Sequence, residues 1–250
     1  MEEIQNIPNE NIVINEENKK PMVILFCIMG DSFSSNFLRS WTELFGFCIS
    51  NNIQPIMINN DGKYPYENRN KCLGINYANT GNNQIPFQGK VNYDYIMWID
   101  SKTVFNVNMF KLLLSSNKNI VSGLCLNHDL KTFNCIESFN NEEFLKTGVY
   151  NFIKNTDISE KKENNEGYEK LLKVNYSCMN FMLMKKGIIE QFDTPWFQPL
   201  KSVFHNNEGE QILNLLENEE YYFSKKCNKL NIDIFVNIDC IVNKEFNIII

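Results

Sequence analysis

A short apolar run near the middle of the chain constrains the fold more than any other feature of the sequence. Residues 95–99 are all aromatic, β-branched or methionine, a composition typical of a strand buried on both faces of a parallel sheet. The run stops abruptly at an acid, a hydroxyl and a base, Asp100, Ser101 and Lys102. Because open α/β sheets bind their ligands beyond the carboxyl ends of their strands, we expect the functional site at this point.

The chain before this run has the order strand, helix, strand. Residues 22–29 are apolar and predict a first buried strand, which Gly30 ends by permitting a tight turn. Apolar residues recur every three or four positions over residues 33–51, which predicts a helix, and residues 53–58 predict a second strand. This β-α-β order predicts an α/β fold with a mostly parallel central sheet flanked by helices.

The second half of the chain carries weaker patterns. We expect strands at residues 119–126 and 174–184, and a charged surface loop at residues 154–170. A largely helical segment at residues 208–227 and a late strand at residues 232–241 complete the expected order of elements.

Length and composition favour one folded unit. The chain has 250 residues, of which 43% are hydrophobic, enough for one substantial core. We see neither an internal repeat nor a linker that would mark a second domain. We therefore expect a polar, flexible tail at residues 1–20 and a single domain over residues 21–250.

Charge and cysteine usage restrict the partners and the compartment. The formal net charge of -6 argues against a global attraction for nucleic acid. Eight Cys without a CxxC pair and only two His give a zinc site little support, and we expect free buried thiols in a reducing compartment. No apolar segment reaches the roughly 18 residues of a membrane span, so we expect no membrane span and a cytoplasmic location.

Several segments stand in the order and spacing of a known family. They are residues 37–41, 69–70, 84–90, 93–101, 121–123, 180–185, 195–197 and 219–223. With these segments the chain resembles the small GT-A glycosyltransferases of large DNA viruses and some bacteria, over residues 21–243. The resemblance implies a GT-A fold and transfer of a sugar from a nucleotide-diphosphate donor, usually a UDP-sugar, to a hydroxyl of a glycan or glycoprotein acceptor. For a viral chain it implies work in the host cytoplasm.

The resemblance fails at the positions that hold the metal. In that family the central strand ends in Asp-x-Asp, whose acids meet the donor ribose and a divalent cation on the diphosphate. Here the positions hold Asp100, Ser101 and Lys102, and the ammonium of Lys102 can pair with the diphosphate but cannot bind a cation. The family's late metal-ligand His is also missing from residues 241–244. Both departures weaken the case for Mn²⁺ or Mg²⁺ binding at Asp100. We therefore expect transfer with weak or no metal dependence.

The resemblance also assigns roles to other side chains. An inverting transferase needs a carboxylate that takes the proton of the acceptor hydroxyl, and Glu220, with Glu219 beside it, matches the family's acidic pair. Arg69 and Asn70 match an Arg-Asn pair that faces the donor, and Asp31 follows the first strand, where the nucleotide base is held. On the residues alone, the two glutamates fit an exposed acidic helix face equally well, and Asp31 fits a helix cap.

An aromatic pair is the candidate acceptor-binding element. Trp196 and Phe197 lie between two prolines, and aromatic faces stack on sugar rings. Packing in the core is the alternative with equal support. His128 and His205 are predicted to be surface or hydrogen-bonded histidines and not ligands.

Two other functions stay open at this point. The departures at Lys102 and Asn243 leave room for a relative that binds nucleotide sugars, or has a structural role, without catalysing transfer. A nucleotidyltransferase on a similar sheet is the third hypothesis. It requires a glycine-rich, basic loop after the first strand, and residues 30–33 do not form one.

Overall fold

The protein is built around an eight-stranded sheet. The computed structural model describes residues 20–79, 83–163, 169–205 and 211–245. The sheet has the order β2-β1-β3-β9-β5-β12-β4, and β7 pairs with β12 beside this path. Its strands are β1 (Met22–Met29), β2 (Ile53–Asn60), β3 (Tyr95–Asp100), β4 (Thr103–Val104), β5 (Ile120–Cys125), β7 (Leu171–Val174), β9 (Phe181–Lys185) and β12 (Ile234–Lys244).

Most strands of this sheet run in the same direction. β1 pairs in parallel with β2 and β3, and β5 pairs in parallel with β12, while β9 runs antiparallel between β3 and β5. The sheet therefore confirms the predicted fold class, a mostly parallel sheet flanked by helices. Because β1, β3, β5 and β12 share a direction, their carboxyl ends meet at one edge.

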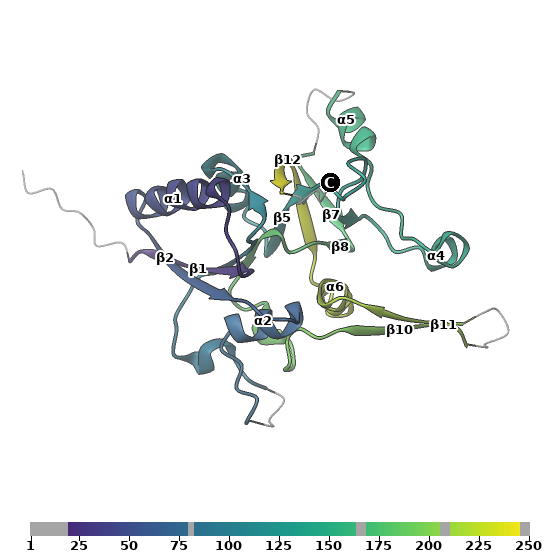
Figure 1. Ribbon diagram of the computed structural model, residues 1–250, viewed down its shortest axis with the longest axis horizontal. Helices are drawn as coiled ribbons and strands as arrows, with labels where there is room; N and C mark the ends of the chain where they lie inside the picture. Colours follow the sequence, from purple (N-terminus) through teal and green to yellow (C-terminus); the bar gives the residue numbers. More distant parts are fainter. Residues whose placement is uncertain (1–19, 80–82, 164–168, 206–210, 246–250) are drawn as a thin grey trace, which may run out of the picture.

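One face of the sheet is covered by α1 (Ser35–Ser50) and α3 (Val107–Ser115), which lie together above the strands in Figure 1. Alternate residues of β1, among them Phe26, point to this face and pack against Phe37 and Phe110 of the two helices. Successive side chains of a strand point to opposite faces, so a run that is apolar throughout requires a helical cover on both sides.

The opposite face is covered by α2 (Pro65–Cys72), α6 (Glu219–Lys229) and the short 3-10 helices η1 (Pro86–Gly89) and η2 (Ile189–Gln191). Trp98 of β3 meets Phe197 edge to face, with ring centroids 5.4 Å apart, and Phe197 stacks on Phe223 of α6 at 5.7 Å. These three buried rings join β3 to α6 and fix the height of α6 above the strand ends.

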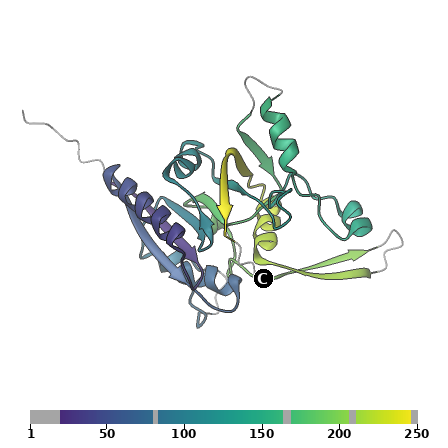
Figure 2. The same ribbon diagram turned by 45° about the horizontal axis from the view of Figure 1, so that its top comes forward.

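A second group of elements extends from one side of the sheet. It consists of α4 (Asn141–Thr147), α5 (Asn155–Glu163), the small pair β6 (Cys135–Ile136) and β8 (Tyr176–Ser177), and the hairpin of β10 (Leu200–His205) and β11 (Gln211–Glu217). The hairpin projects away from the sheet in both views (Figures 1 and 2). At the base of the hairpin, stacked aromatic rings form a small separate core. The ring centroids of Tyr176 and Tyr221 lie 4.1 Å apart, and those of Phe144 and Tyr150 lie 4.4 Å apart.

Three predicted elements are wrong in part. The strand expected at residues 174–184 is broken into β8 and β9, and the loop expected at residues 154–170 contains α5. The helix expected at residues 208–227 starts only at Glu219, because residues 211–217 pair as β11 with β10. Asn218 then caps α6, with its side-chain oxygen accepting from the backbone N–H groups of Glu220 and Tyr221.

Two expectations drawn from the composition can be compared with the structure. All eight cysteines are buried and free, as predicted for the thiols themselves. Within the described ranges, no helix is both long and apolar enough to cross a membrane. The expected flexible tail falls on residues 1–19, which lie outside the described residues, and on Lys20.

Gly30, which follows β1, is held in a conformation that only glycine adopts easily. Its φ is +137°, and a Cβ at this position would collide with the side chain of Ser101. We expect Gly30→Ala to lower the free energy of unfolding by about 1–3 kcal/mol, the usual cost of a strained backbone position. Gly46 is the matched control, because it lies on the exposed side of α1 with nothing within 4 Å of an added Cβ. Gly46→Ala is expected to raise stability by about 0.5–1 kcal/mol. Urea unfolding measures both, and equal effects would contradict this account of the Gly30 turn.

Candidate functional site

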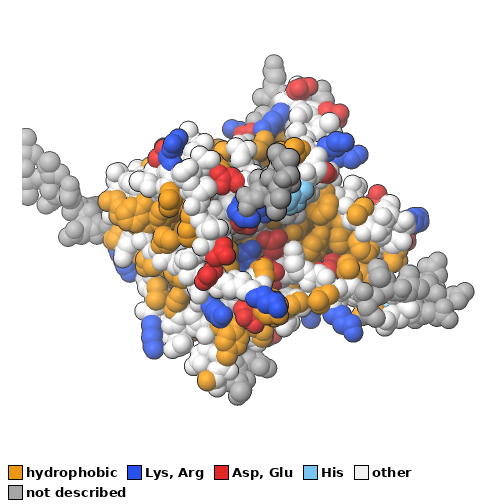
Figure 3. Space-filling view, in the orientation of Figure 1, with side chains coloured by type: hydrophobic (Ala, Val, Ile, Leu, Met, Phe, Trp, Pro, Cys, Tyr) orange, Lys and Arg blue, Asp and Glu red, His pale blue; other side chains and the backbone are white. Residues whose placement is uncertain are grey.

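A cleft of about 980 Å³ opens at the carboxyl edge of the sheet. Charged side chains of both signs gather around a hollow near the middle of the face shown in Figure 3. This cleft is lined by several residues that the sequence analysis predicted for the functional site and that come from distant parts of the chain. They are Asp31, Arg69, Asp100, Ser101, Lys102, Glu219 and Glu220. The cleft thus joins the end of β1, helix α2, the end of β3 and the start of α6.

The centre of the cleft wall is a buried ion-pair network around Arg69. The guanidinium donates from Nε to Glu219 Oε1 at 3.1 Å and from Nη2 to Glu220 Oε1 at 3.0 Å. It also lies 5.4 Å from the centre of the Trp98 ring. Burial lowers the pKa of Arg69, but the two carboxylates raise the pKa by more, so the net shift is upward. Arg69 is only 5% exposed and stays charged.

One guanidinium nitrogen of Arg69 remains available. Nη1 is buried and has no hydrogen-bond partner among the described residues. A buried donor without a partner costs free energy, and native proteins leave few such groups. Since Arg69 lines the cleft, an anionic oxygen of a ligand is a suitable acceptor for this nitrogen.

The two glutamates are buried and differ in how fully they are bonded. Glu220 Oε1 accepts from Met179 N at 2.9 Å as well as from Arg69, and Oε2 accepts from the Tyr176 hydroxyl at 3.1 Å. Burial raises the pKa of Glu220, and Arg69 lowers the pKa by less. Glu219 uses Oε1 for Arg69, whereas its Oε2 makes no hydrogen bond within the described part of the chain. The alternative of an exposed acidic helix face is therefore wrong, since both side chains are less than 10% exposed.

Asp100 at the end of β3 is engaged on both of its oxygens. Oδ1 accepts from the backbone N–H of Lys102 at 2.9 Å, and Oδ2 lies 3.6 Å from the ammonium of Lys244. No role for Lys244 was predicted from the sequence, where residues 241–244 were noted only for lacking a His. The available signal was its place at the end of a late strand parallel to β5, which brings it to the same edge as Asp100.

The side chains around Asp100 do not fit a divalent cation. No group of three or more His, Cys, Asp or Glu that could hold a metal ion exists in the portion of the chain that the structure describes. Both Asp100 oxygens already have partners, and Lys102 occupies the position where the Asp-x-Asp signature has its second acid. Hard cations need several oxygen ligands, and this wall offers ammonium groups instead.

Three predicted binding residues lie away from the cleft. Asn70 is 1% exposed, and its side chain donates to Phe197 O at 2.7 Å and accepts from Phe197 N at 3.2 Å, so it fixes a loop and faces no ligand. Trp196 and Phe197 are fully buried, which corrects their prediction as an acceptor surface. Both side chains pack in the hydrophobic core, which was the alternative prediction. His128 lines the cleft, and His205 is exposed on β10.

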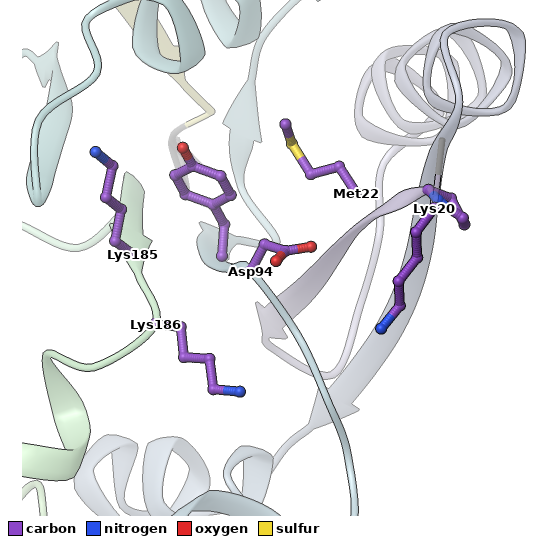
Figure 4. Close-up of a pocket in the computed structure, with 7 residues that line it drawn as sticks. Lys20, Met22, Asp94, Lys185 and Lys186 are labelled. Atoms are coloured by element: carbon purple, nitrogen blue, oxygen red, sulfur yellow. The ribbon is translucent and has the colours of Figure 1, made fainter. Parts of the chain in front are cut away.

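A second hollow lies at the opposite end of the strands. It has a volume of about 520 Å³ and is lined by Lys20, Asp94, Lys185 and Lys186, among others. Lys185 and Lys186 point in opposite directions (Figure 4), and their ammonium groups donate to Asn117 and Asn92. The lysines therefore do not converge on a common ligand position, and the candidate site remains the cleft at the carboxyl edge.

The sequence was compared with protein-family models and with curated proteins, and the structure with solved structures. No family model matches the sequence, and no curated protein matches it. Among solved structures, the chain is similar to the inositol-1-phosphate CTP transferase from T. maritima, with a TM-score of 0.42 and 9% identity over 91% of this chain and 90% of that one. A likeness at this level is a general similarity of chain path, and no chemistry is inferred from it.

Removal of Arg69 tests whether its network stabilises the fold. Arg69→Met leaves two buried carboxylates without their cation, so we expect the free energy of unfolding to fall by about 3–5 kcal/mol. Lys71→Met is the control on the same helix, since Lys71 is exposed and makes only a 3.9 Å contact with Glu67. We expect a change within about 0.5 kcal/mol for the control. A loss for Arg69→Met no greater than that of the control, measured by urea unfolding, would show that the network is not structural.

Proposed function

We propose that the protein is a glycosyltransferase that moves a sugar from a nucleotide-diphosphate sugar, a UDP-sugar by the sequence resemblance, to a hydroxyl of a glycan or glycoprotein acceptor. The observation that carries the proposal is the meeting of Asp100, Arg69 and Glu219 in one cleft at the carboxyl edge of the sheet. These residues come from three distant segments, and their separate predicted roles require that they face one ligand.

The donor occupies the cleft between the ends of β1 and β3. Asp31 and Asp100 follow these two strands, where carboxylates can accept from base and ribose groups. Arg69 Nη1 is the unpaired donor of the wall and binds an anionic or sugar oxygen. Lys102 lines the same cleft and makes no ion pair within the described ranges, so its ammonium is available to the diphosphate.

Sugar transfer with inversion at the anomeric carbon requires a base, and a carboxylate can accept the proton of the acceptor hydroxyl. The acceptor hydroxyl oxygen forms a bond to the anomeric carbon of the sugar as the bond from that carbon to the β-phosphate oxygen breaks. The bonding electrons leave with the nucleoside diphosphate, and the hydroxyl proton passes to the carboxylate. Glu219 suits this role better than Glu220, because Glu219 Oε2 has no partner among the described residues whereas both oxygens of Glu220 are bonded.

Weak or no metal dependence is part of the proposal. It is supported by Lys102 in the Asp-x-Asp position and by the partners of Asp100, whose Oδ1 accepts from Lys102 N and whose Oδ2 lies in an ion pair with Lys244. Charge that builds on the leaving diphosphate then has to be met by side chains of the chain itself.

The second candidate is a relative that binds nucleotide sugars without transferring them. The full hydrogen bonding of Glu220, which matches the family's catalytic base, is the observation that favours it. The two candidates share the donor site and differ in turnover, so one binding experiment and one kinetic experiment separate them.

Calorimetric titration tests the donor site. We expect one of UDP, GDP, CDP and ADP to bind, both with Mn²⁺ and with a chelator present. Asp100→Asn is expected to weaken that binding about tenfold or more, because a charged hydrogen bond to the ribose is lost. Asp233→Asn is the control, since Asp233 pairs with Lys173 on the far side of β12 from the cleft. The proposal is wrong if no nucleoside diphosphate binds under either condition.

Replacement of the candidate base tests transfer. With the donor sugar of the nucleotide that binds, we expect Glu219→Gln to lower kcat for nucleoside diphosphate release about 10²- to 10⁴-fold, with donor affinity largely kept. Glu43→Gln on the exposed side of α1 is the control and is expected to behave as wild type. Donor binding without turnover in the wild-type protein would favour the binding-only relative, and unchanged kcat in Glu219→Gln would remove this residue from catalysis.

A further inference from the structure

The ammonium of Lys244 lies 3.6 Å from Oδ2 of Asp100, on the wall of the cleft. We propose that Lys244 is a diphosphate-binding residue, and that it and Lys102 together supply the positive charge that a metal ion supplies in related sites. This inference rests on the proposed function and adds a residue to it that the sequence did not indicate.

The fold brings the backbone segments that carry the two lysines together. The end of β12 turns away from β5 and pairs antiparallel with β4, so that Lys244 stands opposite Thr103. The backbone N–H of Glu245 then donates to the carbonyl of Lys102 at 2.9 Å. Backbone hydrogen bonds therefore hold Lys244, on β12, close to the turn between β3 and β4 that carries Lys102, and both residues line the cleft. Backbone positions fixed in this way limit how far the chain has to rearrange when the two side chains meet a ligand.

The contact between Lys244 and Asp100 is loose. Ammonium and carboxylate groups that are fully hydrogen-bonded lie about 2.7–2.9 Å apart, so 3.6 Å is an ion pair without a good hydrogen bond. The two side chains are 25% and 30% exposed, and partly exposed ion pairs contribute little to stability. An ammonium has three donors, and this pair leaves them for a ligand. Asp100 thus positions Lys244 without consuming its capacity to bind phosphate.

The remaining charges of the cleft make these two lysines necessary. Two of the three guanidinium nitrogens of Arg69 are committed to Glu219 and Glu220, and the third, Nη1, is buried. Asp31 and Glu245 are further acids of the lining, and Glu245 accepts from the Asn36 amide at 2.8 Å. Acids outnumber bases along the lining, so a diphosphate is held only where positive groups face it directly. Lys102 and Lys244 are the two lysines of the described lining, and the backbone pairing of residues 102–103 with residues 244–245 brings them to the same side of the cleft.

Binding of a nucleoside diphosphate and of its nucleoside separates the role of Lys244 from the rest of the site. Both are titrated into the protein in the presence of a chelator, with UDP and uridine as the probes, or the diphosphate that binds best in the panel and its own nucleoside. We expect Lys244→Met to weaken binding of the diphosphate about 10- to 100-fold, as for loss of a charge-assisted hydrogen bond, and to leave nucleoside binding unchanged. Lys173→Met removes a lysine from another strand-end ion pair, with Asp233, and is expected to bind both probes as wild type.

Two further variants guard against a structural explanation. Lys244→Arg keeps the charge and is expected to bind the diphosphate within about threefold of wild type. Lys244→Gln keeps length and polarity, and repeats the test if the methionine variant does not fold.

The outcomes that overturn the inference differ from those that overturn the proposed function. If Lys244→Met or Lys244→Gln binds the diphosphate as tightly as wild type in chelator, Lys244 has no part in the site. If the wild-type protein binds a nucleoside diphosphate only with Mn²⁺, a metal and not the lysines carries the charge, and the donor site itself stands. If no nucleoside diphosphate binds with Mn²⁺ or with chelator, both the proposed function and this inference are wrong.

Discussion

The buried ion-pair network of Arg69 with Glu219 and Glu220 is the interaction on which the site depends. It joins α2 to the first turn of α6 and rests on the Trp98 ring of β3. Charges taken out of water are tolerated only when they are paired and hydrogen-bonded, and here Met179 N and the Tyr176 hydroxyl complete the partners of Glu220. The network therefore fixes the position of α6 relative to β3, and with it the width of the cleft.

A buried charged network of this kind is not explained by stability alone. Replacing a buried ion pair by apolar residues is often neutral or stabilising, so a charged network in the wall of a cleft points to a role toward a ligand. The carboxylate of Glu220 accepts a hydrogen bond from Arg69 and holds it in place. Oε2 of Glu219 and Nη1 of Arg69 have no hydrogen-bond partner among the described residues. On the opposite side, Lys244 of β12 pairs with Asp100, and Lys102 lies in the adjoining turn between β3 and β4. The buried network of Arg69 with the two glutamates is thus in place before a ligand arrives.

Much of the sheet could be predicted from the sequence, because its buried parallel strands are apolar on both faces and are separated by turn residues. That Asp31 and Asp100 lie at one edge was also predictable, since parallel strands bring their carboxyl ends together. Arg69 and Glu219, which lie on helices, were predicted only through the family resemblance. Residues 211–217 pair as a strand with β10, a long-range interaction that local periodicity does not reveal.

The errors at the site have one physical cause, which is that burial is decided by the whole fold. Nothing in residues 195–199 distinguishes a sugar platform from core packing, and Trp98 and Phe223 decide between them by enclosing Phe197. Asn70 looked like a donor contact but bonds the backbone of Phe197. Lys244 was missed because its neighbour Asp100 is far away in the sequence and meets it only through the pairing of β12 with β4.

The central claim is that this cleft binds a nucleoside diphosphate on protein cations. A crystal structure with UDP and Mn²⁺, with data collected at the manganese absorption edge, tests this claim most directly. The account predicts a diphosphate within hydrogen-bond distance of the Lys102 and Lys244 ammonium groups, with no anomalous peak beside Asp100. An anomalous peak between Asp100 and the diphosphate, or a cleft without nucleotide, would contradict it.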